Sequence, residues 1–133
     1  MVTLPPRIAA FIEEVQREGA VWAIHGADGI PVFRRATGEG ASPFWSNETS
    51  ALLFSATDDA GRGMDPIRIS WKIFRDRWIP GLLTDGLLID VNPQVGMASC
   101  DIAPDALEAL MRTVSGAWQP TASLPSLPNS RAA

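Results

Sequence analysis

The stretch from Trp78 to Asn92 constrains the fold of this chain more than any other. Pro80 and Gly81 are residues that end helices, so a helix is predicted to stop there. Asp85 and Gly86 form a turn signal, because glycine supplies the positive φ that a tight reversal needs. Residues 87–91 read Leu-Leu-Ile-Asp-Val and predict a buried strand. The chain therefore passes from helix to turn to strand within a few residues.

The N-terminal third predicts a helix followed by a hairpin. Ile8, Phe11, Ile12 and Val15 recur at the spacing of one helical face, and Gly19 is placed to end that helix. Residues 20–24 predict a strand. The Asp28-Gly29 turn signal and the apolar residues 30–33 then predict a second strand that pairs with the first.

The middle of the chain predicts two further helices. Ser46 is expected to cap a helix over about residues 47–56. Residues 58–66 predict an exposed loop, and residues 67–69 a short strand. Ser70 is expected to cap the next helix, in which Trp71, Phe74 and Trp78 share one face.

Residues 97–102 are expected to pair with the strand 87–91, and Pro104 to open a last helix that ends at Gly116. The predicted fold is α+β: a small antiparallel sheet of about five strands flanked by about four helices. Residues 4–116 are expected to form one compact domain. Residues 117–133, rich in Pro and Ser, are predicted to be a flexible tail.

Composition narrows the function classes. The 133 residues are 46% hydrophobic, which suits one globular domain. They carry 11 basic and 15 acidic side chains, a net charge of −4, whereas nucleic-acid-binding domains are usually basic. No apolar run is long enough to cross a membrane. The single cysteine, Cys100, excludes an internal disulfide and fits a reducing cytoplasm. We therefore expect a cytoplasmic protein that binds neither nucleic acid nor membrane, of unknown oligomeric state.

The residues that could carry chemistry do not form a recognisable constellation. His25 is the only histidine and sits at a predicted strand end, where it is best read as a turn residue. Cys100 is read as a small buried hydrophobe. Gly38 and Gly40 lack the Lys-Ser/Thr that follows in a phosphate-binding loop. No catalytic residue, cofactor or metal ligand is predicted.

The sequence is more informative about an interaction surface than about a catalytic site. Trp45 precedes a helix start, where it can either pack in the core or line a groove. Arg75 belongs to the basic stretch 68–77, which reads either as the solvated face of a helix or as a docking site for an anionic ligand or acidic partner. With Asp85 and Asn92 from the turns, these residues form the candidate surface: Trp45, Arg75, Asp85 and Asn92.

The chain resembles a family of small bacterial proteins defined only as a domain of unknown function, number 2750. The matching residues are Gly19-x-Val21-Trp22, Asp28-Gly29, Pro43-Phe44-Trp45-Ser46 and the segment 78–92, within a match over about residues 7–112. The chain differs from the family pattern at Pro93, where an aromatic residue is usual. The resemblance implies no activity or cofactor. The Phe-Trp-Ser-helix layout is also loosely similar to immunity proteins of bacterial toxin systems.

These observations predict a non-enzymatic cytosolic protein-interaction module with an unidentified protein partner. An immunity-like or antitoxin-like role is the most specific form of this prediction. The alternative is a small-ligand-binding protein or an enzyme of a class that the sequence does not reveal.

Overall fold

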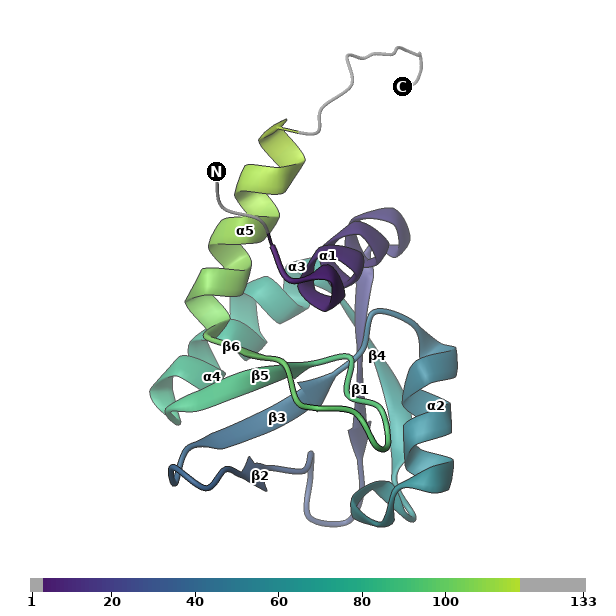
Figure 1. The fold of residues 1–133 in the computed structure, drawn as a ribbon. Coiled ribbons are helices and arrows are strands. Elements are labelled where there is room, and N and C mark those ends of the chain that lie inside the picture. Colours follow the sequence, from purple (N-terminus) through teal and green to yellow (C-terminus); the bar gives the residue numbers. More distant parts are fainter. Residues whose placement is uncertain (1–3, 118–133) are drawn as a thin grey trace.

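The computed structural model describes residues 4–117 and confirms an α+β fold (Figure 1). Residues 118–133, which make up most of the predicted tail, lie outside the described residues. The last described residue, Ala117, is also the last residue of α5. None of the described helices is long and apolar enough to span a membrane. The elements are α1 (Pro6–Glu18), β1 (Ala20–His25), β2 (Phe33–Arg34), β3 (Gly40–Phe44), α2 (Glu48–Thr57), the 3-10 turn η1 (Asp59–Gly61), β4 (Asp65–Ser70), α3 (Trp71–Ile73), the π-helical segment η2 (Phe74–Trp78), α4 (Ile79–Thr84), β5 (Leu87–Val91), β6 (Asp101–Ile102) and α5 (Pro104–Ala117).

The strands form two sheets that meet at one point. β1 and β4 are antiparallel, and β2, β3, β5 and β6 form a second sheet in that order. Within the second sheet β3 and β5 are parallel, so the expectation of a purely antiparallel sheet is wrong for this pair. Trp22 and Trp45 exchange backbone hydrogen bonds of 2.7 and 2.8 Å, which join β1 to the end of β3.

The predicted hairpin between residues 20–24 and 30–33 does not form. Gly26 and Gly29 make a tight turn with two backbone hydrogen bonds, but the chain then leaves β1. Pro31 follows and has no N–H to continue a ladder. The partner of β1 is instead β4, from Ala20 opposite Ser70 to His25 opposite Asp65, while Phe33 pairs with β3.

The sequence indicates the strand β3 only weakly, as a short apolar run over residues 43–45. All five of its residues are buried. A strand buried on both faces has no apolar–polar alternation, and Gly, Ala, Ser and Pro have low strand propensity. The burial of β3 between its neighbours is therefore a property of the tertiary structure.

The helix that begins at Trp71 continues through Pro80 to Thr84, so the prediction that Pro80 and Gly81 end it is wrong. The reason lies in η2, the π-helical segment before the proline. Its wider turn is closed by the N–H of Ile79, which donates to the carbonyl of Phe74, five residues back. This spacing accommodates a proline that an α-helix would exclude.

The helix caps follow the expected chemistry with one shift. Ser70 Oγ accepts from the N–H of Ile73 at 3.2 Å, as predicted. The cap of α2 is Asn47 and not Ser46: Asn47 Oδ1 accepts from the N–H of Ser50 at 2.8 Å. Ser46 is fully buried, and its hydroxyl donates to Glu14 in α1.

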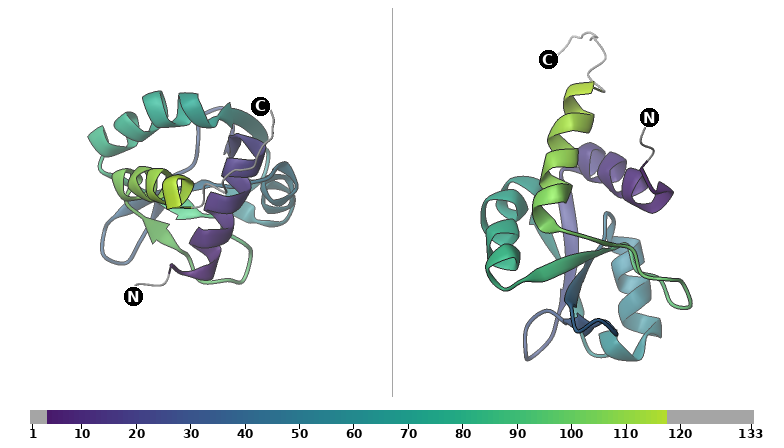
Figure 2. Two further views of the ribbon diagram at one scale, coloured as in Figure 1. Left: turned by 90° about the horizontal axis from the view of Figure 1, so that it is seen from above. Right: turned by 60° about the vertical axis from the view of Figure 1, so that its left-hand side comes forward.

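The core has two parts on opposite faces of the strands. The larger cluster packs α1, α4 and α5 against β1, β3 and β5, with Phe11, Phe44 and Phe74 fully buried in it. Figure 2 shows α1, α5 and the helix α3–α4 gathered together, apart from α2. The smaller cluster lies beneath α2 and contains Trp45 and Phe54.

Candidate functional site

A polar network joins three segments at the carboxyl ends of the parallel strands β3 and β5. Ser46 Oγ donates to Glu14 Oε1 at 2.7 Å, and Asn47 Nδ2 donates to the same oxygen at 2.9 Å. Asn92 Oδ1 accepts from the N–H of Ser46 at 2.9 Å. Asn92 has a φ of 46°, a left-handed conformation that asparagine tolerates better than most residues. The network ties α1 to both strand ends and fixes where the chain leaves β5.

Trp45 supports this region from within and is not a surface contact. Its exposed fraction is 0%, so the prediction that it contributes to an interaction surface is corrected. Its indole Nε1–H donates to the carbonyl of Pro93 at 3.0 Å, and its ring centroid lies 5.2 Å from that of Phe54. A buried indole needs a partner for its N–H, and here the partner lies in the loop after β5. Trp45 therefore sets the position of this loop relative to α2.

The loop of residues 93–99 is held at several points. The N–H of Met97 donates to the carbonyl of Gln94 at 3.1 Å, which closes a turn with Gly96 at a φ of 81°. Arg7 from α1 donates to the carbonyl of Ala98 at 2.7 Å. These bonds fix the backbone of the loop while its apolar side chains stay exposed.

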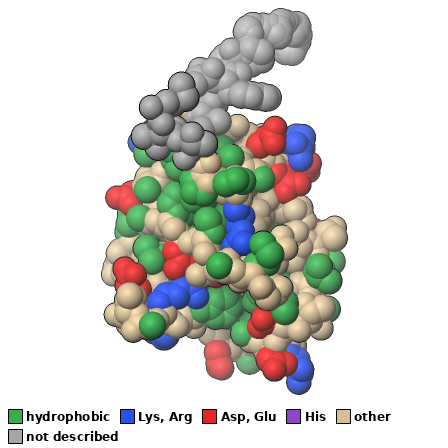
Figure 3. All heavy atoms as spheres, viewed as in Figure 1, with side chains coloured by type: hydrophobic (Ala, Val, Ile, Leu, Met, Phe, Trp, Pro, Cys, Tyr) green, Lys and Arg blue, Asp and Glu red, His purple; other side chains and the backbone are tan. Residues whose placement is uncertain are grey.

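Between α2 and this loop lies a groove, which we call the α2 groove. It consists of two adjoining hollows of about 350 and 280 Å³ that share Phe54, Gln94 and Val95. Leu53 lines the first hollow and Met97 the second; Leu53, Val95 and Met97 are 62%, 54% and 56% exposed. Figure 3 shows hydrophobic side chains on the surface over the loop between β5 and β6. Exposed apolar side chains that line one concavity are typical of interaction sites.

One end of the α2 groove is lined by Arg35 and Asp90, which form a charged cluster with Asp101. Arg35 binds Asp101 through Nε at 2.8 Å and Nη2 at 2.7 Å, and Nη2 also lies 2.9 Å from Asp90 Oδ2. The Asp90 side chain is only 3% exposed. Hydrogen bonds from Arg35 to Asp101, followed by those to Asp90, raise the guanidinium pKa against the opposing effect of burial. The cluster cross-links the segment after β2 to β5 and β6.

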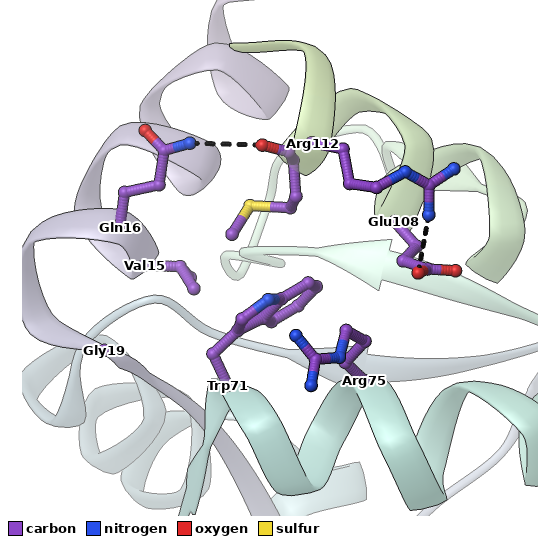
Figure 4. A pocket seen from close by; sticks show the side chains of 8 residues that line it. Val15, Gln16, Gly19, Trp71, Arg75, Glu108 and Arg112 are labelled. Atoms are coloured by element: carbon purple, nitrogen blue, oxygen red, sulfur yellow. Dashed lines mark hydrogen bonds and ion pairs between the residues drawn. The ribbon is translucent and has the colours of Figure 1, made fainter. Parts of the chain in front are cut away.

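A second concavity, which we call the helix hollow, lies between α1, α3 and α5 (Figure 4). It has a volume of about 560 Å³ and an apolar floor of Val15, Trp71 and Met111. Its charged lining residues are Arg75, Arg112 and Glu108. Outside the hollow, Asp76 accepts hydrogen bonds from Arg75 and Lys72, which lower its pKa to about 2.

The four residues predicted as one interaction surface do not form one. Trp45 and Asn92 lie close to each other, joined through Ser46 and Pro93, but they act as internal supports. Arg75 lines the helix hollow. Asp85 is exposed at the end of α4, at the far end of the helix from Trp71.

Sequence reasoning missed the residues that build the α2 groove. Leu52 and Leu53 are adjacent leucines in a helix whose buried side chains are Ala51 and Phe54, so both leucines lie outside its buried face. Val95 and Met97 are apolar residues in an irregular segment, which is the signal that could have identified them. The pairing of Arg35 with Asp90 spans 55 residues and has no sequence signature.

The residues weighed as nucleophiles or bases have ordinary surroundings. His25 is exposed at the end of β1. Burial raises the pKa of the Cys100 thiol, which disfavours the reactive thiolate. Over residues 4–117, no group of three or more His, Cys, Asp or Glu side chains is placed to hold a metal ion.

Comparison with known proteins gives one family and no activity. A family model described as "Protein of unknown function (DUF2750)" matches residues 8–111. No curated protein is significantly similar to the chain. Because the family match covers most of the sequence, from α1 to α5, the chain belongs to the DUF2750 family.

Proposed function

We propose that this protein is a non-enzymatic protein-interaction module of the cytosol and that the α2 groove is its contact surface. The observation that carries the proposal is the exposure of Leu53, Val95 and Met97 along one groove. Each of these side chains offers an apolar surface that water solvates poorly, and burying it against a partner gives about 25 cal/mol per Å².

The walls of the groove are preorganised for binding. Trp45 contacts Phe54 on one wall and Pro93 on the other, and Arg7 and the turn at Gly96 hold the rest of the loop. A partner therefore does not have to order the loop when it binds, and less of the interaction energy is lost to conformational entropy.

The charge of the groove supports a basic partner. Its charged lining residues are Arg35, Asp58 and Asp90, and Arg35 is already paired with both Asp90 and Asp101. The remaining charge is negative, like that of the whole chain. The partner that fits is a protein segment with aliphatic side chains flanked by Lys or Arg. An immunity-like or antitoxin-like role, in which a bacterial protein neutralises a basic partner, is the specific form of this proposal. It is supported by the acidic balance and by the layout around Phe44, Trp45 and Ser46.

The test compares one groove variant with one matched surface variant. Leu53→Asp places a charge in the groove, whereas Leu83→Asp changes a leucine of similar exposure, 45%, on α4. Partners captured by the wild-type chain are identified, purified and titrated against each variant by calorimetry. Proteins encoded by the genes next to the gene for this chain are the first candidate partners to express.

The expected result is a saturable complex that Leu53→Asp weakens at least tenfold, about 1.4 kcal/mol, while Leu83→Asp leaves it unchanged. Circular dichroism and melting temperature establish that both variants fold. A complex that tolerates Leu53→Asp and Val95→Asp as well as Leu83→Asp would show that the groove is not the contact surface.

A further inference from the structure

The helix hollow has the composition of a ligand site, and its location is separate from the α2 groove. Its volume of about 560 Å³ is within the range of small-molecule sites. An apolar floor and a few polar groups at the rim are the usual arrangement in such sites. The hollow lies between three helices that come from distant parts of the sequence.

Hydrogen bonds between these helices define the shape of the hollow. The N–H of Trp71 donates to the carbonyl of Gly19 at 2.9 Å, which joins the start of α3 to the end of α1. Gln16 Nε2 donates to the carbonyl of Met111 at 3.4 Å and joins α1 to α5, as Figure 4 shows. The cavity is therefore a built feature of the helix packing.

The floor presents a flat aromatic surface. Trp71 is partly buried against the main core and stacks on Phe74, with ring centroids 5.7 Å apart. Its indole stands in the hollow in Figure 4, and Val15 of α1 and Met111 of α5 also line the hollow. A planar apolar group can lie against this ring, since aromatic rings favour offset-stacked contacts with a planar partner.

The rim carries a surplus of positive charge. Two guanidinium groups, Arg75 and Arg112, face one carboxylate, Glu108. Arg112 uses Nη1 for Glu108 at 2.6 Å, and Arg75 uses Nε and Nη2 for Asp76. Because a guanidinium has five N–H donors, both arginines keep donors for a ligand. Asp76 is moreover shared with Lys72 at 2.9 Å, so it does not neutralise Arg75 alone.

We propose that the helix hollow binds a small organic carboxylate with a planar apolar group, which lies against Trp71 while its carboxylate meets Arg75 and Arg112. The class of ligand follows from the pairing of an aromatic floor with forked donors at the rim. Glu108 is the competing anion in this arrangement, and its removal should favour the ligand.

The experiment uses the full chain and a matched pair of probes, phenylacetate and its neutral analogue phenylacetamide. Binding is followed by the NMR signals of the indole N–H groups, among which Trp71→Phe identifies the Trp71 signal. We expect phenylacetate to shift this signal saturably and phenylacetamide to bind at least fivefold more weakly.

Charge variants give the second readout. Arg75→Gln and Arg112→Gln should each weaken phenylacetate binding about fivefold or more, and Glu108→Gln should strengthen it. Arg77→Gln, on the same helix but not lining the hollow, is the control and should have no effect. Melting temperatures establish that each variant folds. The proposal is overturned if the Trp71 signal does not shift, if the amide binds as well as the acid, or if the arginine variants bind like Arg77→Gln. These measurements do not depend on the α2 groove, so their outcome is independent of the proposed function.

Discussion

Replacing Arg35 by methionine should be among the more damaging single substitutions in this protein. The change removes the cation that Asp90 and Asp101 share while keeping a side chain of similar length. Asp90 is then left with its side chain only 3% exposed and without a counter-charge. Breaking a buried ion pair by removing one partner costs about 3–5 kcal/mol. Arg35 and Asp101 are 22% and 20% exposed, so water can reach part of the cluster and the lower end of that range applies.

The assay is urea denaturation at neutral pH, followed by tryptophan fluorescence. A loss of about 3 kcal/mol corresponds to a fall of roughly 1–3 M in the urea midpoint for a chain of this size. The matched control is Arg62→Met. Arg62 also pairs with an aspartate, at 2.6 Å, but the two side chains are 80% and 91% exposed. An exposed pair of this kind contributes little, so the control should stay close to the wild type.

A neutralised variant separates lost charge balance from lost packing. In Arg35→Met/Asp90→Asn/Asp101→Asn no uncompensated charge remains, and the asparagine introduced in place of Asp90 would keep an Oδ1 acceptor for the N–H of Cys100. Most of the lost stability should return, because replacing a whole buried ion cluster is often nearly neutral. The reasoning fails if Arg35→Met unfolds at the same urea concentration as Arg62→Met, or if the neutralised variant is no more stable than Arg35→Met.

The remaining predictions concern four other places in the chain. Ser42→Ala should be neutral or slightly stabilising in urea denaturation, because Ser42 Oγ is buried without a hydrogen-bond partner among the described residues; a loss above about 1 kcal/mol would mean that the hydroxyl has a partner. Trp78→Ala should cost about 2–4 kcal/mol, below the value for a fully buried ring, because Trp78 is only partly buried where it packs on Phe44 and Phe74; melting within a degree of the wild type would contradict this. An NMR titration of Asp76 should give a pKa of about 2, below the ordinary 3.8, so its pairing stabilises the fold above pH 3.8 and is lost as the pH falls through 2. Arg75→Gln should move the titration midpoint upward. An unchanged midpoint would show that the hydrogen bond from Arg75 does not lower the pKa of Asp76. A chain that ends at Ala117 should keep its stability within about 2 kcal/mol, because residues 118–133 contain few large apolar side chains; a larger loss would place the domain boundary beyond Ala117.

Much of the fold follows from local patterns. The helical spacing of Ile8, Phe11, Ile12 and Val15, the positive φ of Gly19 and the cap at Ser70 appear in the structure as predicted, since each depends on residues within one or two turns. The turn before β5 and the strand itself also follow from local sequence. Periodicity and caps report the environment of neighbouring residues, which is why they suffice for these elements.

The partners of the strands and the two concavities depend instead on the packing of the whole domain. β1 pairs with β4 and not with residues 30–33, because Pro31 has no N–H with which to extend the turn at Gly26 into a ladder. The local sequence pattern does not show which distant strand pairs with β1 instead. The sequence favours the core for Trp45 but leaves a groove position open, and the hydrogen bond from its indole to the carbonyl of Pro93, 48 residues away, places it inside. Arg35 reaches both Asp90 and Asp101 because the pairing of β5 with β6 places these two aspartates opposite each other. Local sequence was enough to specify where most helices and strands form. Contacts between residues far apart in the chain decide which exposed side chains line a common surface. The loop-closure entropy that these contacts cost is offset only when the complete core has packed.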